Sequence, residues 1–223
     1  MAKFKLALIT LLFTSTSAMA ANQVYIEQSG NTNTVTITQI GDVNSVGASG
    51  LNNQSVITGS NNSLTASQTG DSNTLNYNVT GDGNTVSKSV TGDSNQITFT
   101  CGDGTTACTS VTSTMTVAGT GNAVTSTIKG SSIDNTLSIT GDSNTVTQSI
   151  LTSNSTSSIT ILGDSNTFTS AMSGTSAGSG HSLTATVTGT SNTHSVTQGG
   201  SIDTTVAITT TGSSNAVTIS TTN

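Results

Sequence analysis

Apolar and polar residues alternate with a period of two over short stretches of the chain, and a glycine interrupts the alternation about every eleven residues. One such stretch places Asn73, Leu75, Tyr77 and Val79 on one face, while Thr and Asn occupy the other. This alternation, rich in β-branched residues, is typical of a half-buried β-strand. Each unit therefore predicts one strand of about six or seven residues, followed by a turn.

A short phrase, Gly-x-x-Asn followed after one residue by an aliphatic residue, marks the turns between these strands. Gly, Asp and Asn tolerate left-handed backbone angles and bond their own main chain, so segments such as Gly-Asp-Ser-Asn are typical of turns. Many of the glycines recur in steps of about 11 or 22 residues, which indicates an internal repeat along nearly the whole chain. The asparagines of the phrase are Asn33, Asn44, Asn62, Asn73, Asn84, Asn95, Asn122, Asn144, Asn166 and Asn215, with variants at Asn135 and Asn192.

The repeat predicts an all-β fold, a β-solenoid of stacked two-strand rungs. One strand-turn unit cannot bury its apolar side alone, but two units back to back form a flat rung with their aliphatic faces opposed. Rungs stacked about 4.8 Å apart satisfy one another's backbone groups, and the full period becomes about 22 residues. Asparagines one full period apart would then stack as a ladder of side-chain amides, unless they serve only the turns. The expected ladder asparagines are Asn33, Asn44, Asn62, Asn73, Asn84, Asn95, Asn122, Asn144 and Asn166. We expect one domain over residues 21–223, with side loops near 101–118 and 174–188.

The composition narrows the functions open to such a fold. Only 31% of the 223 residues are hydrophobic and 6% are charged, and no 3.6-residue apolar stripe is present, which excludes a helical bundle. Four cations against ten acidic residues argue against nucleic-acid binding. An enzyme on a parallel β-helix would need a cleft with grouped acids or arginines, whereas the few charges here lie mainly in turns. We therefore expect a non-enzymatic protein without a cofactor.

The first twenty residues are typical of a secretory signal peptide. Lys3 and Lys5 precede a short apolar run at 6–13, and small residues lead to a cleavage site between Ala20 and Ala21. The apolar run is too short to span a bilayer, and no later segment is long and apolar enough for a membrane helix. The alternative is a buried N-terminal helix. The sequence thus predicts export, with the mature chain outside the cell or at its surface.

Residues 26–44 resemble curlin repeats, in which a Gln-x-Gly-x-x-Asn core lies between aliphatic strand residues. Here the glutamines of that core are Gln28, Gln39 and Gln68. The resemblance implies stacked glutamine and asparagine side chains inside a β-solenoid. It further implies self-association into extracellular amyloid fibres for adhesion and biofilm matrix. The partners it implies are an outer-membrane secretion channel and a separate nucleator subunit.

Cys101 and Cys108 bracket a segment in which the regular step lengthens. In an exported protein, two cysteines at this spacing predict a disulfide that closes a small loop. A free redox pair is the alternative, and the absence of a nearby histidine argues against a metal site.

Six aspartates directly follow a turn glycine, and some of them are one full period apart, so they would lie one above another along one edge. They favour either a weak Ca²⁺ column or, more simply, turns whose charge keeps the surface hydrated. The calcium-binding nonapeptide repeat is absent. These aspartates are Asp42, Asp71, Asp82, Asp93, Asp142 and Asp164.

Three further features bear on function. Outward Thr-x-Thr pairs are frequent, as at Thr125 and Thr127, so a monomeric adhesin rod or an ice-binding threonine array are alternatives to a fibre subunit. His194 falls on the inward phase, where a structural role is expected. Lys88 also falls on the inward phase, and because a buried lysine is costly we expect a local departure from the strand pattern, or an ammonium that reaches the open end of the face.

Overall fold

A computed structural model describes residues 8–14, 21–47, 55–102, 106–174 and 181–222, and its described elements are all β-strands. None of them is a helix that could cross a membrane. The strands are β1 Leu8–Thr14, β2 Gln23–Val24, β3 Ile26–Ser29, β4 Thr34–Ile40, β5 Ser45–Val46, β6 Ser55–Thr58, β7 Ser63–Thr69, β8 Thr74–Thr80, β9 Thr85–Thr91, β10 Gln96–Thr100, β11 Thr112–Ala118, β12 Ala123–Ile128, β13 Asp134–Thr140, β14 Thr145–Ile150, β15 Thr156–Thr160, β16 Thr167–Met172, β17 Ser182–Thr188, β18 Thr193–Gly199, β19 Thr205–Thr211 and β20 Ala216–Thr222.

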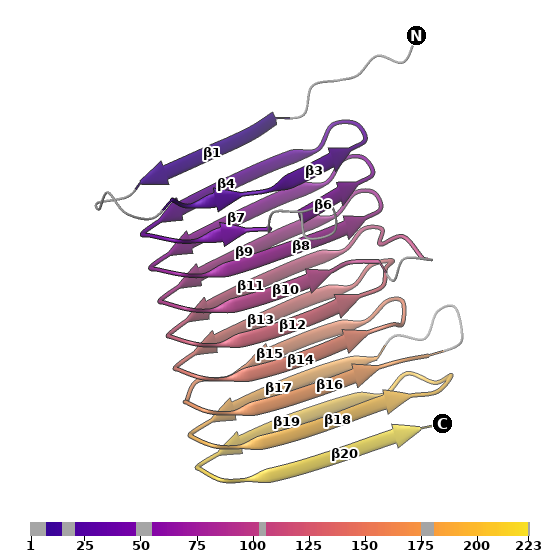
Figure 1. The fold of residues 1–223 in the computed structure, drawn as a ribbon. Helices are drawn as coiled ribbons and strands as arrows, with labels where there is room; N and C mark the ends of the chain where they lie inside the picture. The colour runs from indigo at the N-terminus through magenta and orange to yellow at the C-terminus, as the bar shows by residue number, and fades with distance from the viewer. Residues whose placement is uncertain (1–7, 15–20, 48–54, 103–105, 175–180, 223) are drawn as a thin grey trace.

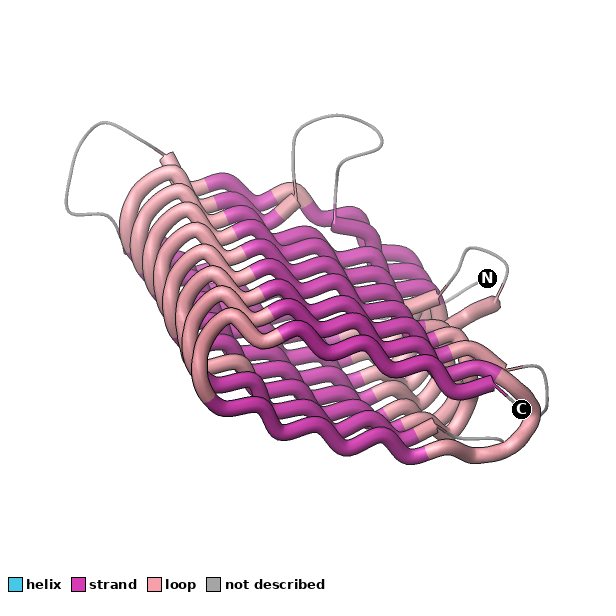
Figure 2. Tube along the Cα trace, turned by 90° about the horizontal axis from the view of Figure 1, so that it is seen from below, coloured by secondary structure: helices cyan, strands magenta, loops and turns pink. Residues whose placement is uncertain are grey.

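The strands form two parallel sheets that face each other, as the two-unit period predicts (Figures 1 and 2). Sheet A runs β1-β4-β7-β9-β11-β13-β15-β17-β19, and sheet B runs from β2 through β5, β8, β10, β12, β14, β16 and β18 to β20, with β3 and β6 beside its first strands. Residues one full period apart are paired over much of the stack, for example Thr125 with Thr147 and Thr147 with Thr169. The fold is therefore a β-solenoid in which the chain alternates between the sheets.

The core lies between the sheets and follows from the two-residue alternation. In β8 the side chains of Leu75, Tyr77 and Val79 are buried, and the residues between them lie toward solvent. The same pattern recurs in nearly every strand, so apolar side chains stack rung upon rung along the whole solenoid. The rings of Tyr77 and Phe99 meet edge to face, 6.5 Å apart, on neighbouring strands of sheet B.

The turn glycines are required because successive turns lie almost in backbone contact. Gly119 has φ of 113°, and a Cβ atom placed there would lie 2.1 Å from the carbonyl oxygen of Gly141 in the next turn. The third residue of the same turns adopts φ of 57° at Ser143 and 56° at Ser165, both in the left-handed region. In these turns the first position therefore excludes a side chain, whereas the third position accepts one.

The register departs from the regular period where the chain inserts extra residues between strands. In sheet A, Thr34 pairs with Ser63 and Thr85 pairs with Thr112, and both steps are longer than the regular one. Both steps contain segments beyond the described residues, 48–54 and 103–105. The side loop expected near 101–118 gives way to β11 at Thr112. The loop expected near 174–188 is shorter, because β17 already begins at Ser182, and its central part, 175–180, lies outside the described residues.

Residues 8–13 of the apolar run in the expected signal peptide form part of the fold in the full-length chain. β1 pairs in parallel with β4, from Leu8 beside Thr34 to Thr14 beside Ile40, and so occupies the end of sheet A. Cleavage between Ala20 and Ala21 remains a prediction. Such cleavage would remove β1 and leave β4 as the end strand of that sheet.

Candidate functional site

A continuous ladder of asparagine side chains lines the edge where the chain enters sheet B. In every rung before the last, the Asn Oδ1 accepts the backbone N–H of the asparagine in the next rung, and from Asn44 onward it also accepts that residue's side-chain Nδ2–H. In the middle of the stack, Asn144 donates from N and Nδ2 to Asn122 Oδ1 at 2.9 and 3.1 Å. The ladder consists of Asn22, Asn44, Asn73, Asn95, Asn122, Asn144, Asn166, Asn192 and Asn215.

The second amide hydrogen of most ladder residues reaches the turn of the next rung. Asn73 Nδ2 donates to Gly92 O at 2.6 Å, and Asn122 Nδ2 donates to Gly141 O at 2.8 Å. The Gly-x-x-Asn phrase thus contains both partners of this hydrogen bond: its asparagine donates to the glycine carbonyl of the next rung. This explains why Gly and Asn recur together. Sequence reasoning left Asn22, Asn192 and Asn215 out of the ladder, although Asn22 lies one full period before Asn44 and could have been found by that spacing.

A shorter ladder follows the opposite edge and ends inside the stack. Asn62 donates to Asn33 Oδ1, and Asn84 donates to Asn62 Oδ1 at 3.1 Å from N and 2.9 Å from Nδ2. Asn84 Oδ1 then accepts only the backbone N–H of Val111, which takes the next ladder position. Beyond Val111, other residue types hold this edge. The two edges therefore differ in how far their asparagines continue.

The three curlin-like glutamines do not form one column. Gln39 and Gln68 lie on neighbouring strands of sheet A, and Gln39 Nε2 donates to Gln68 Oε1 at 2.8 Å. Gln28 lies in β3 on sheet B, beside Ile57, and its buried Oε1 has no hydrogen-bond partner within the described structure. Successive units alternate between the sheets, so a spacing of one unit places Gln28 and Gln39 on different sheets.

The turn aspartates bind backbone rather than one another. Asp71 Oδ1 accepts the backbone N–H of Asp42 at 2.7 Å, and Asp93 Oδ1 accepts that of Asp71 at 2.7 Å. Asp142 and Asp164 act in the same way toward the turns before them. No group of three or more His, Cys, Asp or Glu side chains among the described residues is placed to hold a metal ion. The carboxylates therefore join successive turns.

Cys101 and Cys108 are joined by a disulfide with a Cα–Cα separation of 5.4 Å, and both are buried. The bond closes the loop that leaves β10. Cys108 O also accepts Nδ2–H of Asn84 at 3.0 Å, in the place that a turn glycine carbonyl takes elsewhere. The disulfide thus holds an irregular loop so that it continues the hydrogen bonding of the ladder edge.

Lys88 stays within the regular strand β9 with its ammonium inside the core, so neither the expected departure nor an ammonium at the open end is found. Its Nζ donates to Ser113 Oγ at 2.7 Å and lies 4.2 Å from the centre of the Phe99 ring. Ser113 Oγ in turn donates to Asn135 Oδ1, and Asn135 Nδ2 donates to Gln148 Oε1 at 2.8 Å. A line of polar side chains therefore runs along the core axis.

This burial predicts a pH-dependent stability. Desolvation lowers the pKa of Lys88 from 10.5 to about 7, so the unfolded chain binds more protons between these pH values. Stability should rise through this window, by about 2 kcal/mol between pH 7 and pH 9. Lys88→Met should abolish the rise in urea-unfolding midpoints, whereas Lys129→Met should retain it. If the stability of Lys88→Met still rises over this pH range, the rise must come from another titratable group.

The two histidines lie in the core of the C-terminal rungs. His194 Nε2 lies 2.8 Å from Thr210 Oγ1 and its ring stacks on Phe168 with the centres 6.0 Å apart. Burial lowers the pKa of His194 below its usual value. His181 is also buried, with Nδ1 2.9 Å from Thr204 Oγ1 and Nε2 3.1 Å from Ser173 O. Both rings bridge the C-terminal rungs, and among the described residues their hydrogen-bond partners are hydroxyl and carbonyl groups.

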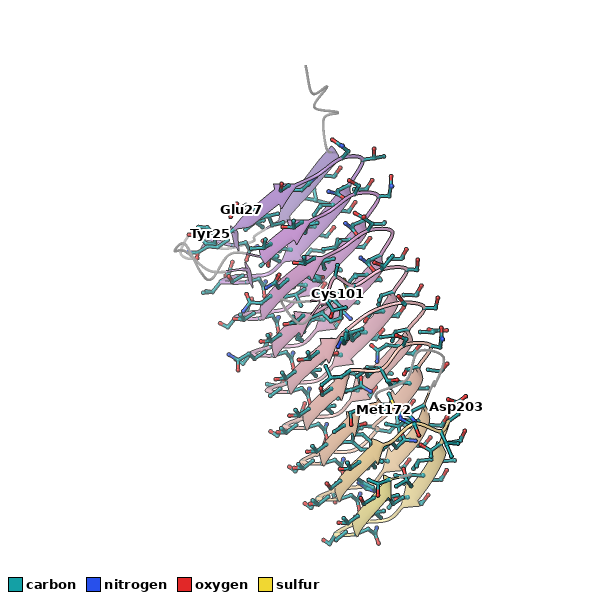
Figure 3. The ribbon with its side chains drawn as sticks, turned by 90° about the vertical axis from the view of Figure 1, so that its right-hand side faces the viewer. Tyr25, Glu27, Cys101, Met172 and Asp203 are labelled. Atoms are coloured by element: carbon teal, nitrogen blue, oxygen red, sulfur yellow. A yellow bond between two sulfur atoms is a disulfide. The ribbon has the colours of Figure 1, made fainter. Side chains whose placement is uncertain are left out.

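The two ends of the stack present strands with one open edge. Among the described strands, β20 ends sheet B and pairs with β18 alone, while β2 and β3 at the other end pair only with β5 and β6. Val24, Ile26 and Ile219 are only partly buried, in contrast to the enclosed core between them. Figure 3 shows Tyr25 and Glu27 at the N-terminal end of the stack. These edges are the candidate functional site, because they can accept further strands.

Comparison with known proteins agrees with this architecture. Residues 20–41 match the family model of the curlin associated repeat. No curated protein and no solved structure matches the chain. The matched residues include β2, β3 and β4 with the turn between them, and the same strand-turn unit continues to β20. The match over these residues supports a curlin-like repeat family, and the fold of the chain is a β-solenoid.

Proposed function

We propose that the chain is a secreted structural subunit, without enzymatic activity, that stacks end to end into extracellular amyloid fibres for adhesion and biofilm matrix. The observation that carries the proposal is the open edge of β20, whose inward residues Val217 and Ile219 are half-buried. β20 contains no charged residue and no proline, the features with which proteins commonly block an exposed edge. An outer-membrane channel and a nucleator subunit are its proposed partners.

The test is assembly of the exported chain, purified from the medium or the periplasm. It should form dye-binding fibres with a diffraction spacing of about 4.8 Å along the fibre axis. Ile219→Lys should slow assembly at least tenfold, because the joined stack would bury the ammonium. Thr218→Lys adds the same charge on the outward face and should assemble nearly as the parent does. A parent chain that stays monomeric for days would contradict the proposal.

A monomeric adhesin rod is the second candidate, and the outer face of sheet B favours it. Thr98, Thr125, Thr147 and Thr169 lie side by side on four neighbouring strands, so they form a regular column of hydroxyl and methyl groups. Such a rod would bind sugars or cell surfaces without assembling. The same assembly experiment separates the two functions, and thermal hysteresis of the monomer would instead select ice binding.

A further inference from the structure

We propose that copies of this chain join head to tail through β20 of one copy and β2–β3 of the next, paired in parallel with Asn215 beside Asn22. This inference rests on the proposed fibre function and adds the partner strand and its register. β20 lies at one end of sheet B and β2–β3 lie at the other, and each end has one open edge. Their joining would continue sheet B from one copy into the next.

The asparagine ladder gives the register, because it is unfinished at both ends in complementary ways. At the C-terminal end, Asn215 donates from N and Nδ2 to Asn192 Oδ1, both at 2.9 Å, and its own Oδ1 is next in line to accept. At the other end, Asn22 Oδ1 accepts Asn44 N–H, and Asn22 Nδ2 donates to Gly41 O. Every ladder residue between them donates to the asparagine before it. Asn22 of the next copy, placed beside Asn215, continues the series.

The side chains that follow match in this register. Val217 lies beside Val24 of the next copy, and Ile219 beside Ile26, and all four are half-buried on the inward face. The next inward pair is Thr221 with Gln28. Thr221 Oγ1 and Gln28 Oε1 are both buried atoms without a hydrogen-bond partner in the described structure. The junction would bring this hydroxyl donor to this amide acceptor, as Gln39 and Gln68 already meet inside one copy.

The proposed junction lacks one strand in sheet A. With β20 on β2–β3, sheet A has a place for one strand between β19 of one copy and β4 of the next. β1 occupies that place beside β4 in the full-length chain. If residues 1–20 are removed on export, one sheet alone holds each junction, whereas two sheets hold every rung inside a copy. The junction is then the weakest step of the fibre, and disruption should release whole subunits.

Disulfide trapping tests the register. Ser220 and Glu27 point outward and would be neighbours across the junction, within the Cα separation that a disulfide spans. Fibres of exported Ser220→Cys/Glu27→Cys chain, oxidised after assembly, should yield covalent oligomers longer than dimers on a non-reducing gel. The matched control is Ser220→Cys/Gln23→Cys, whose second cysteine is displaced by about 13 Å along the strand. It should give at least tenfold less cross-linking.

A charge experiment tests the same pair without cysteines. Ser220→Glu places a second carboxylate beside Glu27 of the next copy and should slow fibre elongation about fourfold at low salt. Glu27→Gln in the same chain should restore the rate, and Ser220→Lys should not slow it. Fibres that form but cross-link equally in both cysteine pairs, or in neither, would overturn the register while leaving the fibre function intact. A parent chain that forms no fibres would overturn both.

Discussion

Serine in place of Gly119 is expected to destabilise the folded chain by about 4 kcal/mol, the largest effect we expect at a turn glycine. The Cβ atom would lie 2.1 Å from Gly141 O and 2.9 Å from Asp142 Oδ1, so two turns would have to separate. The φ of 113° adds backbone strain, because L side chains rarely adopt it. The urea-unfolding midpoint of freshly purified monomer, followed by circular dichroism, measures the loss.

The control for this change is the same substitution two residues later. Gly121 has φ of 67°, and its nearest neighbour, Ser143 Oγ, would lie 3.9 Å from an added Cβ. The equivalent residues of other turns are often serines with a similar backbone angle, such as Ser143 with φ of 57°. Gly121→Ser should therefore change stability by less than about 0.5 kcal/mol. Equal losses at both positions would show that the turns are not in backbone contact.

Leucine in place of Asn144 is expected to cost about 4 kcal/mol, because the change keeps the branched shape of the side chain but leaves buried polar groups unpaired. The backbone N–H and the Nδ2–H of Asn166 would lose their acceptor in the core. The change also removes the Nδ2 donor to Asn122 Oδ1. Each buried polar group left unpaired costs about 1–3 kcal/mol. Asn78→Leu, at an exposed position of β8, is the control and should be nearly neutral in the same unfolding measurement.

Aspartate in place of Asn144 tests whether the ladder needs a side-chain amide, which both donates and accepts, or only a buried polar group. A carboxylate could still accept the hydrogen bonds from Asn166, but it would face the oxygen of Asn122 with no proton to donate. Burial should raise the pKa of this aspartate, so the protonated form is the one that fits. The variant should therefore lose stability as pH rises through that pKa. A loss that is independent of pH between 4 and 8 would argue against an amide ladder.

The repeat predicts the solenoid because a single pattern contains both its strands and its turns. The phase of Leu75, Tyr77 and Val79 defines the inward face, and the spacing of one full period between Asn122 and Asn144 places them one above the other. Local preference and long-range contact thus agree in the regular units. That agreement is why the fold and most of the ladder follow from the sequence.

Other features could not be predicted from the repeat, because they depend on contacts with residues in distant units or on how inserted residues shift the register. The burial of Lys88 requires Ser113 and Phe99, which lie in later units, and the insertion near the disulfide changes the register on the way to Ser113. Asn192 joins the ladder only because the extra residues before β17 are absorbed between strands, as the lengthened step from Asn166 shows. The sheet to which Gln28 belongs likewise follows from counting units rather than from its motif.

Distances between spin labels on sheet B test the solenoid most directly. Thr98 is labelled together with Thr169 or with Thr218, all residues in one column of paired strands. Three and five strand spacings of about 4.8 Å predict distances between the labelled backbone sites of about 14 Å and about 24 Å, with narrow distributions. Broad distributions, or a second distance that does not exceed the first by about two spacings, would contradict a chain whose rungs stack in this register.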